Sequence, residues 1–254
     1  MSDLPDPHSA NDTAAAAQHG SRSNGRHAFS PVELDFERLE PREASARSAQ
    51  FLERMRSRRS VRHFSPEPVP LALIENAIAT AGTAPSGANQ QPWMFVVVGD
   101  AATKARIREA AEHEEKLLYE RRASDEYLEA LKPIGTTWQK PHLTEAPYVI
   151  AVFEQPWGYD ESGRRRKHYY VRESVGIAVG FFLASLHTAG LATLTHSPAP
   201  MEFVTRILGR PTNERALLLI PVGYPAAGAT VPRLPKKAAR EISELLLGSE
   251  PFPR

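Results

Sequence analysis

Residues 111 to 122, AEHEEKLLYERR, place a glutamate and a tyrosine four positions apart. In a helix, residues i and i+4 lie one above the other, so the Glu115 carboxylate and the Tyr119 phenol could reach one ligand together. A carboxylate accepts hydrogen bonds from an ammonium group, and a phenol can donate one to a carboxylate. Charged helices are more often solvated surfaces, so the pair gains meaning only from the rest of the chain.

A second group of residues could bind an anion. The run RRSVRHFS, residues 58 to 65, contains three arginines that offer several fixed donors to a phosphate or to an electron-rich ring edge. The later segment TAPSGANQQP contains a small, bent Pro-Ser-Gly loop, which lets the backbone approach a flat ligand closely. Alone, the basic run would be read as solvated surface. The two segments together favour a ligand site.

Several catalytic motifs are absent. GTAPSG, residues 82 to 87, has the glycine spacing of a phosphate loop, but Ala88-Asn89 follow where lysine and serine or threonine are required. His113-Glu114 lacks the second histidine of a zinc protease, and Ser86 lacks the glycine that precedes a nucleophile elbow. The 9 histidines do not cluster at metal-ligand spacing. We expect no metal site.

Composition restricts the class of protein further. With 254 residues, of which 41% are hydrophobic and 24% charged, the chain can bury one sizeable core or two small ones. It has 0 cysteines, which excludes disulfides, thiolate metal sites and a cysteine nucleophile. Its 31 basic and 30 acidic residues give a net charge of +1, too little to attract nucleic acid or a membrane surface. These features favour a small-molecule ligand.

The N-terminal region is predicted to be disordered. It is rich in Ser, Asn, Ala, Pro and Gly, without the apolar periodicity that would offset the entropy of ordering. We therefore expect a disordered tail over residues 1 to 38 and one folded domain over residues 39 to 254. The first residues include an acid and prolines but no apolar core of signal-peptide length, so a cytoplasmic location is expected.

Helical periodicity predicts the elements around these segments. Helices are expected at residues 44 to 55, at 70 to 82, through the charged stretch of 111 to 122, and at 168 to 189. The second ends at Gly82 and the last stops at Gly190, as helix C-termini commonly do. The run VGIAVGFFLASL inside the last helix is too short to span a bilayer, so it predicts a buried helix.

Apolar runs of strand length alternate with these helices. Strands are expected at residues 93 to 99, 146 to 154, 191 to 198 and 215 to 225. The segment GYDESGRRRKHYY is interpreted as a polar loop or hairpin. Because no regular strand-helix-strand repeat is present, the pattern predicts a single α+β domain.

The motifs resemble those of the nitroreductase-like flavoprotein superfamily, in which an Arg-Arg-Ser-Val-Arg motif and a Pro-Ser-Gly loop hold FMN. The order and spacing of RRSVR, TAGTAPSGA, PWMFVVV, HYY, LGRP and LLIPVGYP followed by ATVP are similar to the iodotyrosine deiodinase family, its reductive dehalogenases. The resemblance covers most of residues 40 to 240. It implies a three-layer fold with a central mixed, mainly antiparallel sheet flanked by helices. It also implies a homodimer of the domain-swapped type with FMN at the interface, to which the helix of residues 171 to 189 would contribute.

The resemblance also gives the opening pair a role. In this family a mobile lid and the flavin bind the zwitterion of an amino acid, and here the lid would cover residues 108 to about 142. Glu115 would pair with the substrate ammonium, while Lys140 and the Tyr119 hydroxyl would bind its carboxylate. The backbone N–H of Ala88 would bind the substrate phenolate.

The FMN contacts that the resemblance implies come from four parts of the chain. Two of these positions depart from the family pattern. Lys236 stands where the family has arginine, so it loses the bidentate fork. Ser197, predicted to act catalytically beside flavin N5, stands where the family has threonine, so its hydroxyl lacks the methyl that stiffens it. The full set is Arg58, Arg59, Ser60, Val61, Arg62, Pro85, Ser86, Gly87, Thr195, His196, Ser197 and Lys236.

The resemblance implies FMN-dependent reductive dehalogenation of halotyrosines, in which reduced FMN supplies two electrons in two one-electron steps. NAD(P)H would be the ultimate reductant, directly or through a flavin reductase. Three alternatives stay open: a general nitroreductase or quinone reductase, the flavin-fragmenting branch of the superfamily, and a non-catalytic FMN-binding protein. The first two need no zwitterion-binding lid, so the trio of Glu115, Tyr119 and Lys140 counts against them.

Overall fold

The computed structural model describes residues 29 to 246, so most of the expected N-terminal tail lies outside the described residues. The chain forms two units, Met1–Ser45 and Ala46–Arg254. In the first unit, residues 29 to 40 have no regular secondary structure and nearly all are exposed. Helix α1, Pro41–Ser57, begins in the first unit and ends in the second.

A four-stranded antiparallel sheet lies at the centre of the second unit, in the order β1-β2-β6-β5. The expected strands are present, and the pairs between these four are all antiparallel. Parallel pairing occurs as an isolated bridge between Ser60 and Thr193. The strands are β1 (Trp93–Val98), β2 (Tyr148–Glu154), β5 (Ala192–Thr193) and β6 (Arg215–Gly223).

The strand expected at residues 191 to 198 is much shorter than its sequence indicates. Only Ala192–Thr193 pair regularly, and the chain touches the sheet again at one bridge between His196 and Leu219. Between these two points the Leu194 N–H donates to the Pro221 carbonyl at 3.3 Å. Because proline has no N–H, Pro221 cannot donate in return, and the regular ladder stops there.

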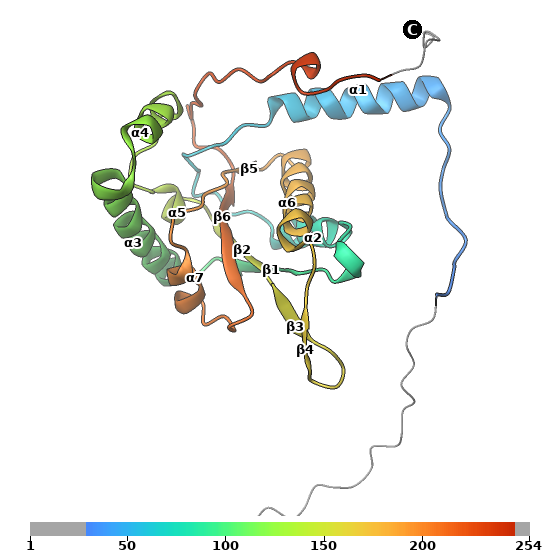
Figure 1. Cartoon of the computed structure of the whole chain (residues 1–254). Coiled ribbons are helices and arrows are strands. Elements are labelled where there is room, and N and C mark those ends of the chain that lie inside the picture. The colour runs from blue at the N-terminus through green and yellow to red at the C-terminus, as the bar shows by residue number, and fades with distance from the viewer. Residues whose placement is uncertain (1–28, 247–254) are drawn as a thin grey trace, which may run out of the picture. The chain divides into compact units, whose positions relative to one another are not determined.

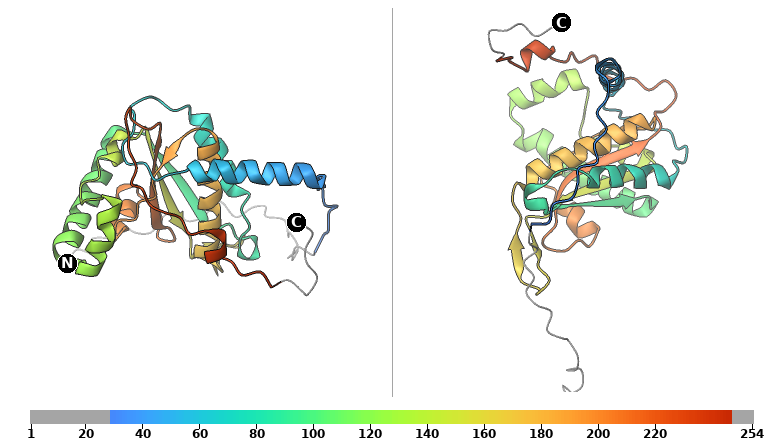
Figure 2. Two further views of the ribbon diagram at one scale, coloured as in Figure 1. Left: turned by 90° about the horizontal axis from the view of Figure 1, so that it is seen from above. Right: turned by 90° about the vertical axis from the view of Figure 1, so that its right-hand side faces the viewer.

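Helices cover both faces of the sheet, which gives three layers (Figure 1). On one face lie α2, Leu71–Gly82, and α6, Val171–Thr188, whose buried residues form a core with Ile150 and Ile220. On the other face lie α3 (Ala101–Leu117), α5 (His142–Glu145) and α7 (Glu202–Ile207). Figure 2 shows the same layers from two further directions. The predicted three-layer α+β fold is confirmed.

Helix α6 is less buried than its apolar sequence predicts. Val175 and Phe182 are fully buried against the sheet, but Ile177 is 43% exposed and Phe181 is 39% exposed. The prediction of a buried helix is therefore wrong for one face, which carries apolar side chains on the surface of the single chain. No helix within residues 29 to 246 is long and apolar enough to cross a membrane.

The polar segment after β2 is a hairpin of β3, Trp157–Tyr159, and β4, Arg165–Lys167. Short 3-10 turns occur at Gly87–Asn89, Lys132–Ile134 and Ala239–Glu241.

The region expected to form a lid has an interrupted helical structure. Helix α3 continues into a π-helical turn, Leu118–Arg122, and a further short helix, α4, covers Asp125–Leu131. The Ser124 hydroxyl caps α4 by accepting from the Tyr127 N–H at 3.2 Å. This helix was missed in the sequence because none of its residues is buried, so it has no apolar face to detect.

Candidate active site

The three arginines after α1 form a half-buried group of cations on the sheet edge. The Val61 N–H donates to the Thr193 carbonyl at 3.0 Å and so fixes this segment beside β5. Within residues 29 to 246, no acidic side chain pairs with any of these arginines, although Arg59 donates to the Pro232 carbonyl. Burial is the main cause that lowers the pKa of Arg62. Partly buried cations are costly unless an anion pairs with them. These arginines could therefore bind the phosphate of a ligand.

Two cavities adjoin these cations. One, of about 270 Å³, is lined by Arg58 and Arg59 together with apolar residues before and within β5. The other, of about 250 Å³, lies between the arginine segment, the end of the lid and the C-terminal segment. Its lining residues are Ser60, Arg62, His63, Ile134, Gly135, Thr230, Val231 and Pro232. The donors and the space fit a flat anionic cofactor.

The segment after β5 turns alternate residues to opposite sides. Thr195 and Ser197 are exposed, whereas His196 between them is only 9% exposed. The His196 ring lies against Glu115 of α3, so the structure does not place all three residues toward one ligand.

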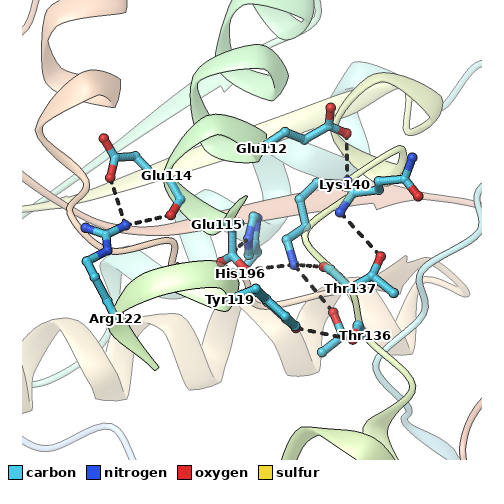
Figure 3. A network of polar contacts seen from close by, with 10 residues as sticks. Glu112, Glu114, Glu115, Tyr119, Arg122, Thr136, Thr137, Lys140 and His196 are labelled. Atoms are coloured by element: carbon cyan, nitrogen blue, oxygen red, sulfur yellow. Dashed lines mark hydrogen bonds and ion pairs between the residues drawn. The ribbon is translucent and has the colours of Figure 1, made fainter. Parts of the chain in front are cut away.

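The three residues predicted to bind the substrate zwitterion lie together (Figure 3). Glu115 Oε2 lies 3.0 Å from Lys140 Nζ, and these side chains are 9% and 4% exposed. The Lys140 ammonium lies 5.8 Å from the centre of the Tyr119 ring. The Tyr119 hydroxyl donates to the Thr136 carbonyl at 3.2 Å. A buried acid and a buried ammonium therefore lie beside a half-buried phenol.

A glutamate that the sequence did not single out holds this cluster together. Glu112 Oε1 accepts from the Lys140 backbone N–H at 2.7 Å and from Arg108 Nε at 2.8 Å. Arg108 also donates to the Thr144 hydroxyl at 2.9 Å. Glu112 therefore joins α3 to the segment that carries Lys140. The i, i+4 spacing of Arg108 and Glu112 was a signal in the sequence, but such pairs are common on exposed helices.

The charges of the cluster stabilise one another. Burial alone would raise the pKa of Glu115, but His196 and Lys140 together hold it below its ordinary value. Burial raises the pKa of the Tyr119 phenol. At neutral pH Glu115 is therefore a carboxylate and Tyr119 a neutral phenol.

The predicted Pro-Ser-Gly loop is built by its own side chains and by the hairpin. The Ser86 hydroxyl accepts from the Gln91 N–H at 2.9 Å. The Gln90 side chain donates to the Lys167 carbonyl at 3.0 Å and accepts from the Tyr169 N–H at 2.8 Å. A Cβ at Gly87 would lie 2.7 Å from the Tyr169 carbonyl oxygen. Glycine is thus required here by the neighbouring backbone.

Next in this loop, two consecutive residues, and Gln91 with φ of 47° after them, adopt a backbone conformation that favours glycine. Ala88 has φ of 50° and Asn89 has φ of 52°. Such conformations cost about 1 kcal/mol or more and cluster at ligand sites. Within residues 29 to 246 the Ala88 N–H donates to no acceptor, so it is available to a ligand.

This loop lies at the opposite end of the sheet from the arginines. The loop leads into Trp93, which pairs with Glu154, the last residue of β2. The arginine segment joins Thr193, which pairs with Val222 opposite Tyr148, the first residue of β2. The 7 residues of β2 separate the two ends by about 20 Å. One chain therefore cannot bring both segments to one small ligand.

The structure therefore brings together the arginine segment, the lid trio and, through His196, the segment after β5, but not Pro85–Ala88. Lys236 follows the cavity-lining residues Thr230 to Pro232, and its side chain is exposed.

Two buried histidines lie behind the trio. The rings of His142 and His196 meet edge to face at 5.3 Å, and their Nε2 atoms have no hydrogen-bond partner within residues 29 to 246. Burial, reinforced by the nearby cations, lowers the pKa of His142 from 6.5 to about 3. His142 is therefore neutral in the folded protein at neutral pH.

This histidine predicts a loss of stability in acid. Below pH 6.5 His142 binds a proton in the unfolded state but not in the folded state. The free energy of unfolding therefore falls as pH drops toward 3. We expect His142 to lower the free energy of unfolding by roughly 3 kcal/mol between pH 7 and pH 4. Denaturant unfolding of the wild type and of His142→Phe at pH 7 and pH 4 measures it. The variant should lose less stability between these pH values, and an equal loss in both proteins would contradict the assignment.

Comparison with known proteins agrees with this geometry. Residues 55–224 match the model of the nitroreductase family. The chain is 55% identical over 199 residues to an iodotyrosine deiodinase of Haliscomenobacter hydrossis, covering 78% of this chain and 90% of that relative. It is 46% identical over 213 residues to an iodotyrosine deiodinase of Daphnia pulex, covering 84% and 71%.

Solved structures give the same result. A crystal structure of oxidized iodotyrosine deiodinase bound to FMN and 3-iodo-L-tyrosine matches with a TM-score of 0.66 at 32% identity, covering 80% of this chain and 100% of that chain. An FMN-dependent nitroreductase of Mycobacterium smegmatis, in complex with NADPH, matches with a TM-score of 0.60 at 23% identity. At that identity the second match shows a shared fold alone.

Proposed function

Because this chain belongs to the iodotyrosine deiodinases of the nitroreductase family, we propose that it is an FMN-dependent enzyme that reductively dehalogenates halotyrosines. The observation that carries this proposal is the buried ion pair of Glu115 and Lys140 with the half-buried Tyr119 beside it. A general nitroreductase has no need of an acid and an ammonium in a closed site. An amino acid zwitterion carries the two complementary charges.

Substrate binding exchanges one internal ion pair for two intermolecular ones. Without substrate, Glu115 and Lys140 neutralise each other at 3.0 Å. The substrate ammonium then takes the place of Lys140 beside Glu115, while its carboxylate binds the Lys140 ammonium and the Tyr119 hydroxyl. These charged hydrogen bonds are strengthened when the closed lid excludes water.

The cofactor would be bound mainly by arginines that have no acidic partner within residues 29 to 246. Arg58, Arg59 and Arg62 would bind the anionic part of FMN, with Lys236 as a further cation. Ser60 and Val61 accompany these arginines, and Thr195 and Ser197 present hydroxyls on the exposed side of their segment. FMN, when bound, supplies the two electrons of the reaction.

A second copy of the chain would complete the site. Pro85, Ser86, Gly87 and Ala88 lie a sheet length from the arginines, so the loop that serves one FMN belongs to the other chain of a homodimer. The exposed apolar residues Ile177 and Phe181 of α6 support such an interface. There the Ala88 N–H would bind the substrate phenolate, which positive charge nearby also favours.

NADPH is the proposed source of electrons, directly or through a flavin reductase, as the family resemblance of the sequence implies. The cytoplasmic location expected from the sequence remains a prediction.

The test is an anaerobic reaction of the FMN-loaded, dithionite-reduced protein with iodo-, bromo- and chlorotyrosine. One carbon–halogen bond breaks, one C–H bond forms, and two electrons and a proton are consumed as halide leaves. We expect flavin reoxidation with equal amounts of tyrosine and halide. Reduction of nitroarenes or quinones without any of this dehalogenation would favour the general reductase instead.

Variants at Ser197 test its role in the same assay. We expect Ser197→Ala to slow dehalogenation about tenfold, because one oriented hydrogen bond is lost, while nitroarene reduction survives or rises. Ser197→Thr keeps the hydroxyl and restricts χ1, so it should retain or raise the dehalogenation rate. An alanine variant that loses both reactions equally would give Ser197 no selective role.

A further inference from the structure

A buried histidine stands behind the lid acid, on the sheet side (Figure 3). His196 Nε2 lies 3.5 Å from Glu115 Oε1, while Lys140 Nζ lies 3.0 Å from Oε2 of the same carboxylate. The backbone of His196 exchanges two hydrogen bonds with Leu219, at 2.9 and 2.8 Å. The ring is thus carried by the sheet, whereas Glu115 and Lys140 belong to the proposed lid.

The ring nitrogens of His196 are buried and unsatisfied within the described residues. Neither of its nitrogens has a hydrogen-bond partner within the described residues, so the 3.5 Å approach to Glu115 is not a formed hydrogen bond. An unsatisfied buried donor is costly, and the Glu115 carboxylate is the acceptor that faces Nε2. A small shift of Glu115 converts this approach into a hydrogen bond.

We propose that His196 is a positioning residue for substrate recognition, which donates from Nε2 to Glu115 Oε1 and leaves Oε2 to the substrate ammonium. This inference rests on the proposed function. When Lys140 turns to the substrate carboxylate, Glu115 loses its internal ion-pair partner. His196 then remains as the donor that keeps the carboxylate directed toward the substrate, because the sheet holds its ring in place.

The charged groups around His196 give this arrangement a dependence on pH. Burial is the main cause that lowers the pKa of His196 below 6.5, and its contact with Glu115 opposes that effect. Because the pKa of Glu115 is held below its ordinary value, its carboxylate stays ionised between pH 5 and 7. The facing groups are Glu115, Tyr119, Lys140, His142 and Arg62.

His196 is therefore neutral at pH 7 and takes up a proton only as pH falls below 6.5. A protonated ring beside Glu115 would weaken its attraction for the substrate ammonium. The affinity for a zwitterionic substrate should then fall as pH decreases through the pKa of His196, which lies below 6.5.

The experiment measures binding of 3-iodotyrosine and of 2-iodophenol to the FMN-loaded protein by quenching of flavin fluorescence, between pH 5 and 7. The ratio of the two dissociation constants cancels the ionisation of the phenol and reports on zwitterion recognition alone. The variants are His196→Leu, which removes the donor, and His196→Gln, which keeps one. His113→Gln, an exposed histidine on α3, is the matched control.

For wild type and His113→Gln, we expect a preference for iodotyrosine at pH 7 that decreases severalfold as pH falls through the pKa of His196. His196→Leu should lose about tenfold of this preference at pH 7. His196→Gln should keep most of it but show no decrease in acid. If the leucine variant does not fold, the pH profile of the glutamine variant decides.

Two results would overturn the inference alone: a leucine variant with the preference of wild type at pH 7, or a glutamine variant that keeps the decrease in acid. A wild type that binds both ligands equally would instead overturn the proposed zwitterion site, and this inference with it.

Discussion

Replacing both Arg58 and Arg59 with alanine is expected to weaken FMN binding at least a hundredfold. Both residues are half-buried, lack an acidic partner within residues 29 to 246, and line the same cavity. Each charged hydrogen bond contributes about 1.5–3 kcal/mol, so the loss of two reaches that magnitude. Fluorescence titration of the apoprotein with FMN measures the effect.

The matched control is the double variant Arg106→Ala and Arg206→Ala. It removes the same charge from exposed positions on α3 and α7, so it separates local contacts from the overall field. The control should bind FMN as wild type does. If the double variant of Arg58 and Arg59 stays fully loaded with FMN after dialysis, these arginines do not belong to the flavin site.

The second large effect concerns substrate rather than cofactor. Glu115→Gln and Lys140→Gln should each retain FMN but bind 3-iodotyrosine tenfold or more weakly. Iodophenol has no zwitterion, so its affinity should change much less. Each single change also leaves the other charge buried without its partner, which costs stability in the free protein. Isothermal titration of both ligands, with thermal unfolding of the free proteins, separates the two effects.

A neighbouring ion pair provides the control for this prediction. Lys116 and Glu120 lie 3.9 Å apart on the same helical segment, with side chains 53% and 52% exposed. Changing either to glutamine should leave both affinities near those of wild type, because exposed pairs contribute little. The double variant of Glu115 and Lys140 should unfold at a higher temperature than either single variant. Equal losses for iodotyrosine and iodophenol would exclude a zwitterion site.

Long apolar runs made most of the fold predictable. The cores of β1, β2 and β6 are continuous apolar segments, and α2 and α6 have apolar residues at helical spacing. The end of β5 was not predictable. It depends on Pro221 of β6, and the sequence does not show that β6 lies beside β5. Helix α4 has no buried residue and so gave no periodic signal.

The candidate site was predictable to the extent that its residues lie in motifs. Glu115, Tyr119 and Lys140 were expected together from a resemblance, and the structure places them together. The role of Glu112 could not be predicted, because it depends on a contact with the Lys140 backbone, 28 residues away in the sequence. The side that His196 faces also depends on tertiary structure, because its segment is not a regular strand.

The separation of the arginine segment from the Pro-Ser-Gly loop by the length of the sheet has a genetic consequence. In the proposed homodimer, each site takes its arginines from one chain and its loop from the other. A chain damaged only in the arginines, paired with a normal chain, leaves one of the two sites intact. A chain damaged in both segments removes both sites of the same mixed dimer. Such a chain would lower activity below the level left by losing one gene copy, because it inactivates the normal chain with which it assembles.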